Sequence, residues 1–189
     1  MINNNLTEFL YNIDNLRNLV RYQTAPRVSS ETVAEHSYFV SVYVLKLHDY
    51  YEFNLSKALE MSLLHDFSEV FISDVPHPIK SKYTKINNEL TKAEHEVNRI
   101  CISEEFSNNL EEFNNLSSAE GIMVALADIL SVVTYSKYEI NLGNSKYMKN
   151  VYNNAERRYR EVIKLAEPYL RTGYTSETIL SYINEFYNL

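Results

Sequence analysis

The sequence predicts an all-α fold, on three observations. Apolar residues recur at intervals of three and four along most of the 189 residues, which is the spacing of one helix face. Three glycines and four prolines are too few for the tight turns of an all-β protein. Hydrophobic residues make up 45% and charged residues 23%, the balance of a globular chain that buries a core. Because about 150 residues is the usual domain size and no long linker occurs, we expect a single domain over residues 1–189.

Three helices are predicted in the first seventy residues, at 6–21, 32–50 and 54–70. The first is supported by an unbroken series of apolar residues at helical spacing. A loop at 23–32 follows it, since this segment holds Pro26 and several hydroxyl residues. The third helix starts at a residue that can cap it, either Asn54 or Ser56.

A break separates these helices from the C-terminal half. Two prolines in the segment 73–78 forbid a continuous helix there. A helix of alternating charge is predicted at 87–102, and the asparagine-rich stretch 108–117 is predicted to be a second break. Apolar spacing places the remaining helices at 118–140, 146–170 and 176–187.

Charge and cysteine content exclude several classes of function. The net charge of −7, with an isoelectric point near 5.3, argues against nucleic-acid binding, which requires a basic surface. We expect no membrane association, since no apolar run approaches the roughly 20 residues of a span. The first residues lack the basic and apolar blocks of a secretory signal, and the single cysteine, Cys101, cannot form an internal disulfide. These features favour a cytoplasmic protein.

A His-Asp dipeptide in a predicted buried helix is the first indication of a metal site. His65 and Asp66 follow two leucines, and a buried carboxylate needs a partner. His36, at the start of the second predicted helix, and Asp128, in an apolar helical stretch, are similar groups. Two neutral imidazoles and two carboxylates balance a 2+ ion. We therefore expect one divalent metal ion, Co²⁺, Mn²⁺ or Zn²⁺, with Mg²⁺ and Fe²⁺ as further options.

Two other acidic positions have more than one interpretation. Glu69 follows His65 by four residues and Asp66 by three, so all three would project from the same side of one helix. There Glu69 would act as general base toward a water whose pKa the metal lowers. The alternative is an exposed helix glutamate. The second His-Asp dipeptide, His48-Asp49, is interpreted as a solvated helix end.

The ordered set of these blocks is similar to the HD-domain phosphohydrolases, and within them to the bacterial 5'-deoxynucleotidases. The resemblance covers about residues 5–165. The blocks that carry it are Arg21-Tyr22, Thr32 to Ser37, His65 to Glu69, Asp74 to Lys80, and Ala127-Asp128. It implies an HD-domain helical bundle with a metal site in its core, and a metal held by His36, His65, Asp66 and Asp128.

The resemblance also implies roles for other residues. Glu69 would position the nucleophilic water, and Asp74 would contact the substrate sugar or the reacting phosphate. Arg21 would bind the phosphate, with Arg27 and Lys80 as further phosphate contacts. These residues are all present in the chain.

Tyr22 is a departure from the family pattern. The bacterial branch usually has tryptophan at this position, where the ring crowds the 2' position of the sugar and favours deoxy substrates. The phenol ring of Tyr22 is smaller than an indole and can form a hydrogen bond. Tyr22 is a candidate substrate-binding residue, and the sequence alone does not decide whether it favours deoxy over ribo substrates.

The predicted activity is hydrolysis of deoxyribonucleoside 5'-monophosphates to deoxyribonucleoside and phosphate. The first alternative is a deoxynucleoside triphosphate triphosphohydrolase, which uses the same fold and metal ligands. The small set of cations, Arg21, Arg27 and Lys80, favours the monophosphate. The second alternative is a non-catalytic nucleotide-binding module, which the complete set of expected ligands disfavours. The resemblance implies a homodimer as well.

Overall fold

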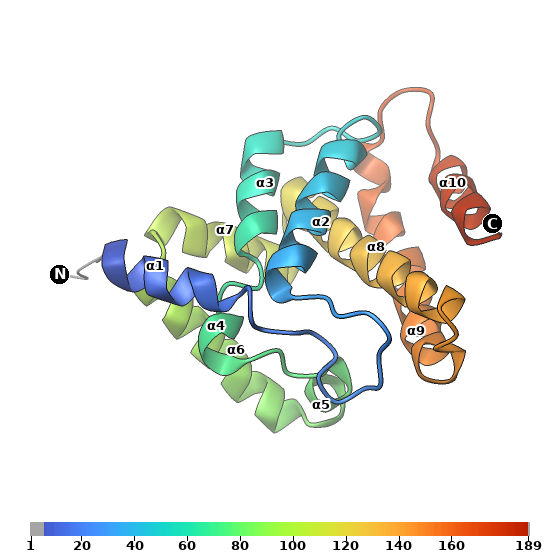
Figure 1. Ribbon diagram of the computed structural model, residues 1–189. Coiled ribbons are helices and arrows are strands. Elements are labelled where there is room, and N and C mark those ends of the chain that lie inside the picture. Colours follow the sequence, from blue (N-terminus) through green and yellow to red (C-terminus); the bar gives the residue numbers. More distant parts are fainter. Residues whose placement is uncertain (1–5, 189) are drawn as a thin grey trace.

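The computed structural model describes residues 6–188, and every regular element within them is a helix (Figure 1). In chain order they are α1 (Leu6–Asn15), α2 (Val33–Leu47), α3 (Leu55–Leu64), α4 (Glu69–Ile72), α5 (His77–Lys82), α6 (Thr84–Cys101), α7 (Glu104–Asn115), α8 (Ala119–Asn141), α9 (Ser145–Ala166), the 3-10 helix η1 (Glu167–Tyr169) and α10 (Ser176–Asn188). The prediction of an all-α fold is confirmed.

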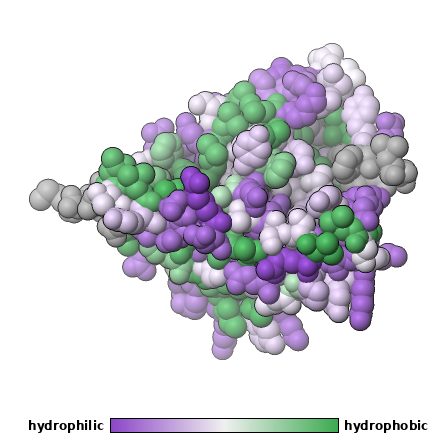
Figure 2. Space-filling model, in the orientation of Figure 1, coloured by the Kyte–Doolittle hydropathy of each residue, from purple (hydrophilic) through white to green (hydrophobic). Residues whose placement is uncertain are grey.

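Helix α8 forms the centre of the molecule and packs against α2, α3, α7 and α9 (Figure 1). Its apolar residues meet those of α2 and α3 in the main core, where the most buried side chains include Val40, Val44, Met61, Met123 and Leu126. By length and composition α8 could cross a membrane, but 67% of its most apolar window is buried inside the protein, so α8 is a core helix. On the face shown in Figure 2 apolar residues lie in separate patches between polar ones.

A second, smaller cluster holds the α1, α6 and α7 side of the molecule together. It is built on Phe67, Ile102 and Leu110, with Phe9 and Ile13 of α1 packed against it. The Phe9 and Phe67 rings stack with their centroids 5.7 Å apart. The long loop between α1 and α2 runs toward α5 and returns to the start of α2 (Figure 1).

The predicted helix 54–70 is interrupted, and this corrects the sequence interpretation. Helix α3 ends at Leu64, and a turn at 65–68 separates it from α4, which begins at Glu69. In that turn the amide of Phe67 donates to Leu64 O at 3.0 Å. The expectation that His65, Asp66 and Glu69 share one helix face is wrong, since the chain leaves the helix at the point where these polar side chains turn toward the centre of the molecule.

The predicted break at 108–117 is also wrong for most of its length. Helix α7 covers Glu104–Asn115, and Ser103 caps it by accepting a hydrogen bond from the amide of Phe106 at 3.3 Å. It ends at Leu116, which is left-handed with φ of 49°. Helices α7 and α8 come so close that a Cβ on Gly121 would lie 2.7 Å from Glu112 O. Packing therefore outweighs the low helix propensity of the asparagines.

Smaller differences concern helix ends. Helix α1 ends at Asn15 rather than 21, and α6 begins at Thr84 rather than 87. Helix α5, which directly precedes α6, begins at His77 and has a proline in its first turn. Backbone amides in the first turn make no hydrogen bond within the helix, so proline is tolerated there. The predicted second dipeptide, His48-Asp49, lies at the C-terminal end of α2, where the side chain of Asp49 is exposed and pairs with Lys46.

Candidate active site

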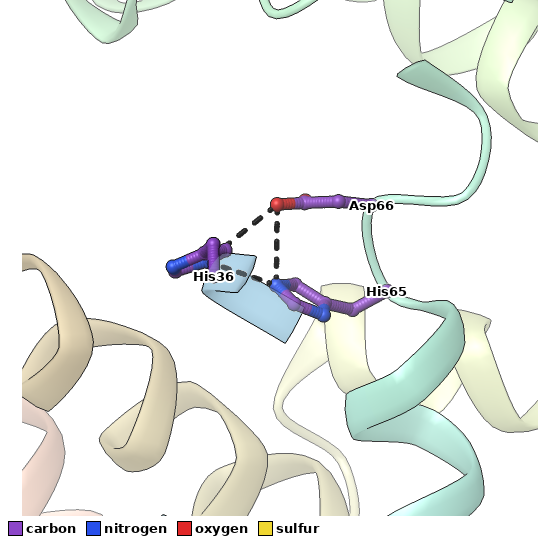
Figure 3. Close-up of side chains that lie close together, drawn as sticks. All are labelled: His36, His65 and Asp66. Atoms are coloured by element: carbon purple, nitrogen blue, oxygen red, sulfur yellow. Dashed lines mark hydrogen bonds and ion pairs between the residues drawn. The ribbon is translucent and has the colours of Figure 1, made fainter. Parts of the chain in front are cut away.

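Four side chains from three parts of the fold converge at the boundary between the two clusters. His36 lies in the first turn of α2, His65 and Asp66 follow α3, and Asp128 lies in the middle of α8. His36 Nε2 is 3.3 Å from His65 Nε2, 3.6 Å from Asp66 Oδ2 and 3.2 Å from Asp128 Oδ1. His65 Nε2 is 3.3 Å from Asp66 Oδ2 (Figure 3). The ligand atoms of His36, His65 and Asp66 therefore all lie within 4.8 Å of one another, and Asp128 adjoins this group through its contact with His36.

Local hydrogen bonds turn both imidazoles toward this centre. A capping box formed by Thr32 and Glu35 fixes the start of α2, which directs His36 inward. His65 Nδ1 lies 2.9 Å from Ser62 O, and since a carbonyl only accepts, this nitrogen carries a hydrogen. The Nε2 lone pair of a neutral His65 therefore points to the centre. His36 Nδ1 lies 3.0 Å from Ser131 Oγ, and the ring presents Nε2 in the same way.

The donor set fits a divalent ion. Ligand atoms that each lie about 2.1 Å from one ion are about 3.0 to 3.5 Å from each other, and the atoms of His36, His65 and Asp66 are 3.3 to 3.6 Å apart. Imidazole nitrogen with carboxylate oxygen suits Zn²⁺, Mn²⁺, Co²⁺ or Fe²⁺. The imidazoles of His36 and His65 are almost fully buried, whereas the side chains of Asp66 and Asp128 are 23% and 17% exposed. The carboxylate side of the centre is therefore open to a substrate.

The pKa shifts of the four side chains show that positive charge stabilises the ionised carboxylates of Asp66 and Asp128. Burial opposes the charged form of Asp128, but the hydrogen bond from His36 and the neighbouring charges lower its pKa to about 2. The pKa of Asp66 is lowered too, by His65 despite burial. Burial lowers the pKa of His36 to about 4, while Asp66 outweighs burial at His65 and raises its pKa to about 9. A divalent ion would supply the charge that His65 otherwise takes up as a proton.

Glu69 lies beside this centre at the first position of α4. It is 8% exposed, and Oε2 has no hydrogen-bond partner among the described residues. Burial, followed by the charges of Asp66 and Asp74, raises the pKa of the Glu69 carboxyl well above its usual range. Such a group readily takes up a proton near neutral pH. The break in the helix therefore leaves Glu69 near Asp66 and Asp74, although not in the way that the spacing predicted.

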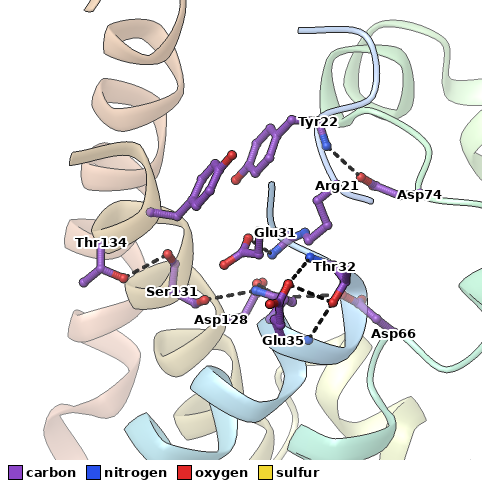
Figure 4. Close-up of polar contacts among 12 residues, drawn as sticks. Arg21, Tyr22, Glu31, Thr32, Glu35, Asp66, Asp74, Asp128, Ser131 and Thr134 are labelled. Carbon is purple, nitrogen blue, oxygen red and sulfur yellow. Dashed lines mark hydrogen bonds and ion pairs between the residues drawn. The ribbon is translucent and has the colours of Figure 1, made fainter. Parts of the chain in front are cut away.

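Arg21 and Tyr22 come from the long loop between α1 and α2 (Figure 4). Arg21 Nη1 is 3.4 Å from Glu31 Oε2, and the carboxylates of Asp66, Glu31 and Asp128, with Tyr22, raise the pKa of Arg21 although burial opposes them. The amide of Tyr22 donates to Asp74 Oδ2 at 3.3 Å, which its left-handed backbone (φ of 56°) permits. The loop thus places the guanidinium of Arg21 near Asp66 and Asp128 and holds Asp74 by a hydrogen bond.

Comparison with known proteins identifies the family. Residues 8–171 match the 5'-deoxynucleotidase YfbR-like family. The chain belongs to this family. A curated 5'-deoxynucleotidase of Pasteurella multocida is 25% identical to it over 154 residues, covering 75% of this chain and 79% of that protein. A 5'-deoxynucleotidase of Vibrio vulnificus is 27% identical over 153 residues, with coverage of 75% and 79%.

Solved structures agree on the HD-domain fold. An HD-domain phosphohydrolase of Listeria innocua has a TM-score of 0.66 at 25% identity, covering 83% of this chain and 82% of that one. PH0347 of Pyrococcus horikoshii has a TM-score of 0.71 at 24% identity, with coverage of 96% and 98%. The cyanophage S-2L HD phosphohydrolase DatZ, solved with dA and one catalytic Zn²⁺, has a TM-score of 0.52 at 17% identity, with coverage of 82% and 95%. The YfbR-like chain is therefore a hydrolase with an HD-domain fold, and its family is one of nucleotide phosphohydrolases.

The other two predicted phosphate contacts of this YfbR-like protein are already partnered. Arg27 Nη1 donates to Tyr22 O at 3.1 Å, so its guanidinium supports the loop. Lys80 Nζ pairs with Glu94 Oε1 at 3.2 Å. Glu94, Glu69 and Asp66 raise the pKa of Lys80 although burial opposes them, which means that the ammonium also faces the acidic centre. The described contacts of Lys80 and Arg27 are therefore to Glu94 and to the backbone of the loop, respectively.

Sequence reasoning missed three residues around the site. Glu31 pairs with Arg21, and Ser131 contacts His36. Tyr135 stacks on Tyr22, with the ring centroids 5.0 Å apart and the planes at 7°. Ser131 and Tyr135 follow Asp128 by three and seven residues, so helical spacing from a predicted ligand could have indicated them. Glu31 had no such signal.

Proposed function

We propose that this YfbR-like protein hydrolyses deoxyribonucleoside 5'-monophosphates to the deoxyribonucleoside and orthophosphate, with one divalent metal ion. The observation that carries the proposal is the group of His36, His65 and Asp66, whose ligand atoms lie within 4.8 Å of one another, with Asp128 Oδ1 3.2 Å from His36 Nε2. The side chain of Arg21 lies within electrostatic reach of Asp66 and Asp128, so a phosphate bound at this centre would meet a guanidinium.

Glu69, Arg21 and Asp74 have separate roles in the proposed reaction. A divalent ion bound here would polarise the phosphate and lower the pKa of a water molecule. Glu69 orients the attacking water through its unpaired oxygen and, in its ionised form, takes one of the protons of that water. Arg21 holds the phosphate oxygens while the bond from phosphorus to the 5' oxygen breaks. Asp74, fixed by the amide of Tyr22, protonates the leaving oxygen or holds a sugar hydroxyl.

The cations of the site support a monophosphate rather than a triphosphate. Arg21 and Lys80 each already have a carboxylate partner, Glu31 and Glu94, and Arg27 is bonded to the carbonyl of Tyr22. A triphosphate carries more negative charge and would need cations that these partners do not neutralise. The triphosphohydrolase is therefore the second candidate, and it would release triphosphate in place of orthophosphate.

The test is product analysis with purified protein. We expect orthophosphate from a panel of deoxynucleoside monophosphates with Mn²⁺, Co²⁺ or Zn²⁺, and no product after Asp66→Ala. Asp49→Ala is the matched control, because Asp49 belongs to the other His-Asp dipeptide and lies exposed beside Lys46. Normal activity in Asp66→Ala would refute the metal assignment. Tight nucleotide binding with no product in the wild type would support the non-catalytic module instead.

Three further properties belong to the same proposal. We propose a single domain over residues 1–189, a cytoplasmic location and a homodimer. An uncharged helix face supports the homodimer, since α2 exposes Tyr38, Phe39, Val42 and Leu45. Light scattering of the wild type and of Val42→Lys tests it: a dimeric wild type and a monomeric variant are expected, and a monomeric wild type would refute it.

A further inference from the structure

A second carboxylate in α8 lies far from the metal centre and serves the loop that carries Arg21. Glu139 is fully buried, 11 residues after Asp128. At the helical rise this separates the two residues by about 16 Å along the helix axis, so Glu139 does not touch the reacting atoms. Its Oε2 accepts from the amide of Val28 at 2.8 Å and its Oε1 from the amide of Ser29 at 2.6 Å. The carboxylate thus binds two backbone amides of the loop.

Neighbouring residues of the same helix hairpin bind the same part of the loop. Asn144 Nδ2 donates to Glu139 Oε2 at 2.7 Å and to Pro26 O at 2.9 Å. The hydroxyl of Tyr135 donates to Ser29 O at 2.8 Å. Burial opposes the charged form of Glu139, but the hydrogen bonds from Val28, Asn144 and Ser29 hold the pKa of its carboxyl below the usual range. The loop tip at 26–29 is therefore attached to the end of α8 at several points.

The two ends of this loop meet at the active site. The amide of Arg21 donates to Glu31 O at 2.9 Å, and Val20 and Thr32 form an isolated antiparallel bridge. Residues 21–31 therefore make a closed loop whose neck carries Arg21 and whose tip lies on α8. Tyr22, next to the neck, stacks on Tyr135 of α8, which also bonds to the tip.

We propose that Glu139 is a positioning residue for nucleotide binding: it fixes the loop tip to the helix that carries Asp128, so that Arg21 and Tyr22 keep their orientation toward the metal centre. The inference rests on the proposed function. A buried carboxylate is costly unless hydrogen bonds compensate it, and here the compensating donors come from the loop and from Asn144. One helix thereby sets the position of both a metal ligand and the phosphate-binding arginine.

The test is Glu139→Gln, with Glu120→Gln as matched control. Glutamine places an N–H donor against a donating amide of the loop, which releases the tip. Glu120 lies on the same helix and also accepts from a distant backbone amide, that of Asn54 at 2.7 Å, away from the site. We expect the KM for a deoxynucleoside monophosphate to rise about tenfold in Glu139→Gln, with kcat and the affinity for Mn²⁺ within about threefold of wild type. Glu120→Gln should leave all three unchanged.

Limited proteolysis supplies a readout that does not depend on activity. Trypsin cleaves after Arg27, which lies at the loop tip, and we expect faster cleavage there in Glu139→Gln than in the wild type or Glu120→Gln. Asn144→Ala, which removes the donor to Pro26 O, should shift the KM and the cleavage in the same direction, and it serves if Glu139→Gln does not fold.

The outcomes separate the two proposals. A lower melting temperature with an unchanged KM and unchanged cleavage after Arg27 would make Glu139 a merely structural residue and overturn the inference. A wild type that binds Mn²⁺ but hydrolyses no nucleotide would refute the proposed function, while the cleavage comparison would still decide whether Glu139 holds the loop.

Discussion

Removal of the Ser131 hydroxyl, which contacts His36 on the side of the ring away from the proposed metal ion, should weaken metal binding. Ser131 Oγ lies 3.0 Å from His36 Nδ1, and both side chains are at most 1% exposed. With Nε2 facing the ion, Nδ1 carries the hydrogen and donates it to Ser131. In Ser131→Ala this N–H stays buried without its acceptor, a penalty of about 1–3 kcal/mol. Loss of such a support for a metal-bound histidine typically costs about 10–100-fold in metal affinity, and we expect that range.

Calorimetric titration of Mn²⁺ into chelator-stripped protein measures this effect directly. Ser136→Ala is the control, because Ser136 lies on the same helix, is equally buried, and donates to Val133 O of that helix. A dissociation constant for Ser131→Ala within a factor of two of the wild type would refute the reasoning. An equal loss in Ser136→Ala would also refute it, because the effect would then belong to the helix rather than to His36.

Three further changes have expected outcomes that a thermal melt can check. Gly121→Ala should destabilise the fold by about 1–3 kcal/mol, since the new Cβ would lie 2.7 Å from Glu112 O where α7 meets α8. Tyr22→Phe should keep or raise the melting temperature, because the hydroxyl of Tyr22 is buried without a hydrogen bond among the described residues. Glu69→Gln should abolish activity yet raise the melting temperature in chelator at pH 7.5. The folded-state pKa of Glu69 is raised, so the wild type loses stability as pH rises above the unfolded value near 4.5, and the gain should shrink toward pH 5.

The helical fold was predictable because its signal is local. Apolar spacing marks the core face of α2 and α8, and capping residues such as Thr32 and Asn54 mark where helices begin. The two errors have tertiary causes. At 65–68 the chain leaves the helix where His65 and Asp66 turn toward partners 29 and more residues away. At 104–115 asparagines that favour a break are held in α7 by packing against α8.

The candidate metal ligands were predictable because a carboxylate or imidazole in an apolar segment needs a partner. That reasoning applies to Asp128, which lies among apolar residues in the sequence. It does not apply to the loop 21–31, which is not an apolar segment. The role of this loop depends on hydrogen bonds from Val28 and Ser29 to Glu139, more than 100 residues away, and no local pattern encodes them.

The same requirement explains why Asp128 and Glu139 of α8 are retained inside the protein. Asp128 is mostly buried and Glu139 fully buried in a core helix, where an uncompensated charge would cost several kcal/mol. The first is compensated by imidazoles that a metal can join, and the second by amides of the loop. Each charge therefore binds a distant segment to α8: Asp128 binds α2 through His36, and Glu139 binds the loop that presents Arg21. Replacing Glu139 with an apolar residue would remove a buried charge, but it would leave the amides of Val28 and Ser29 without acceptors and the arginine without a fixed position.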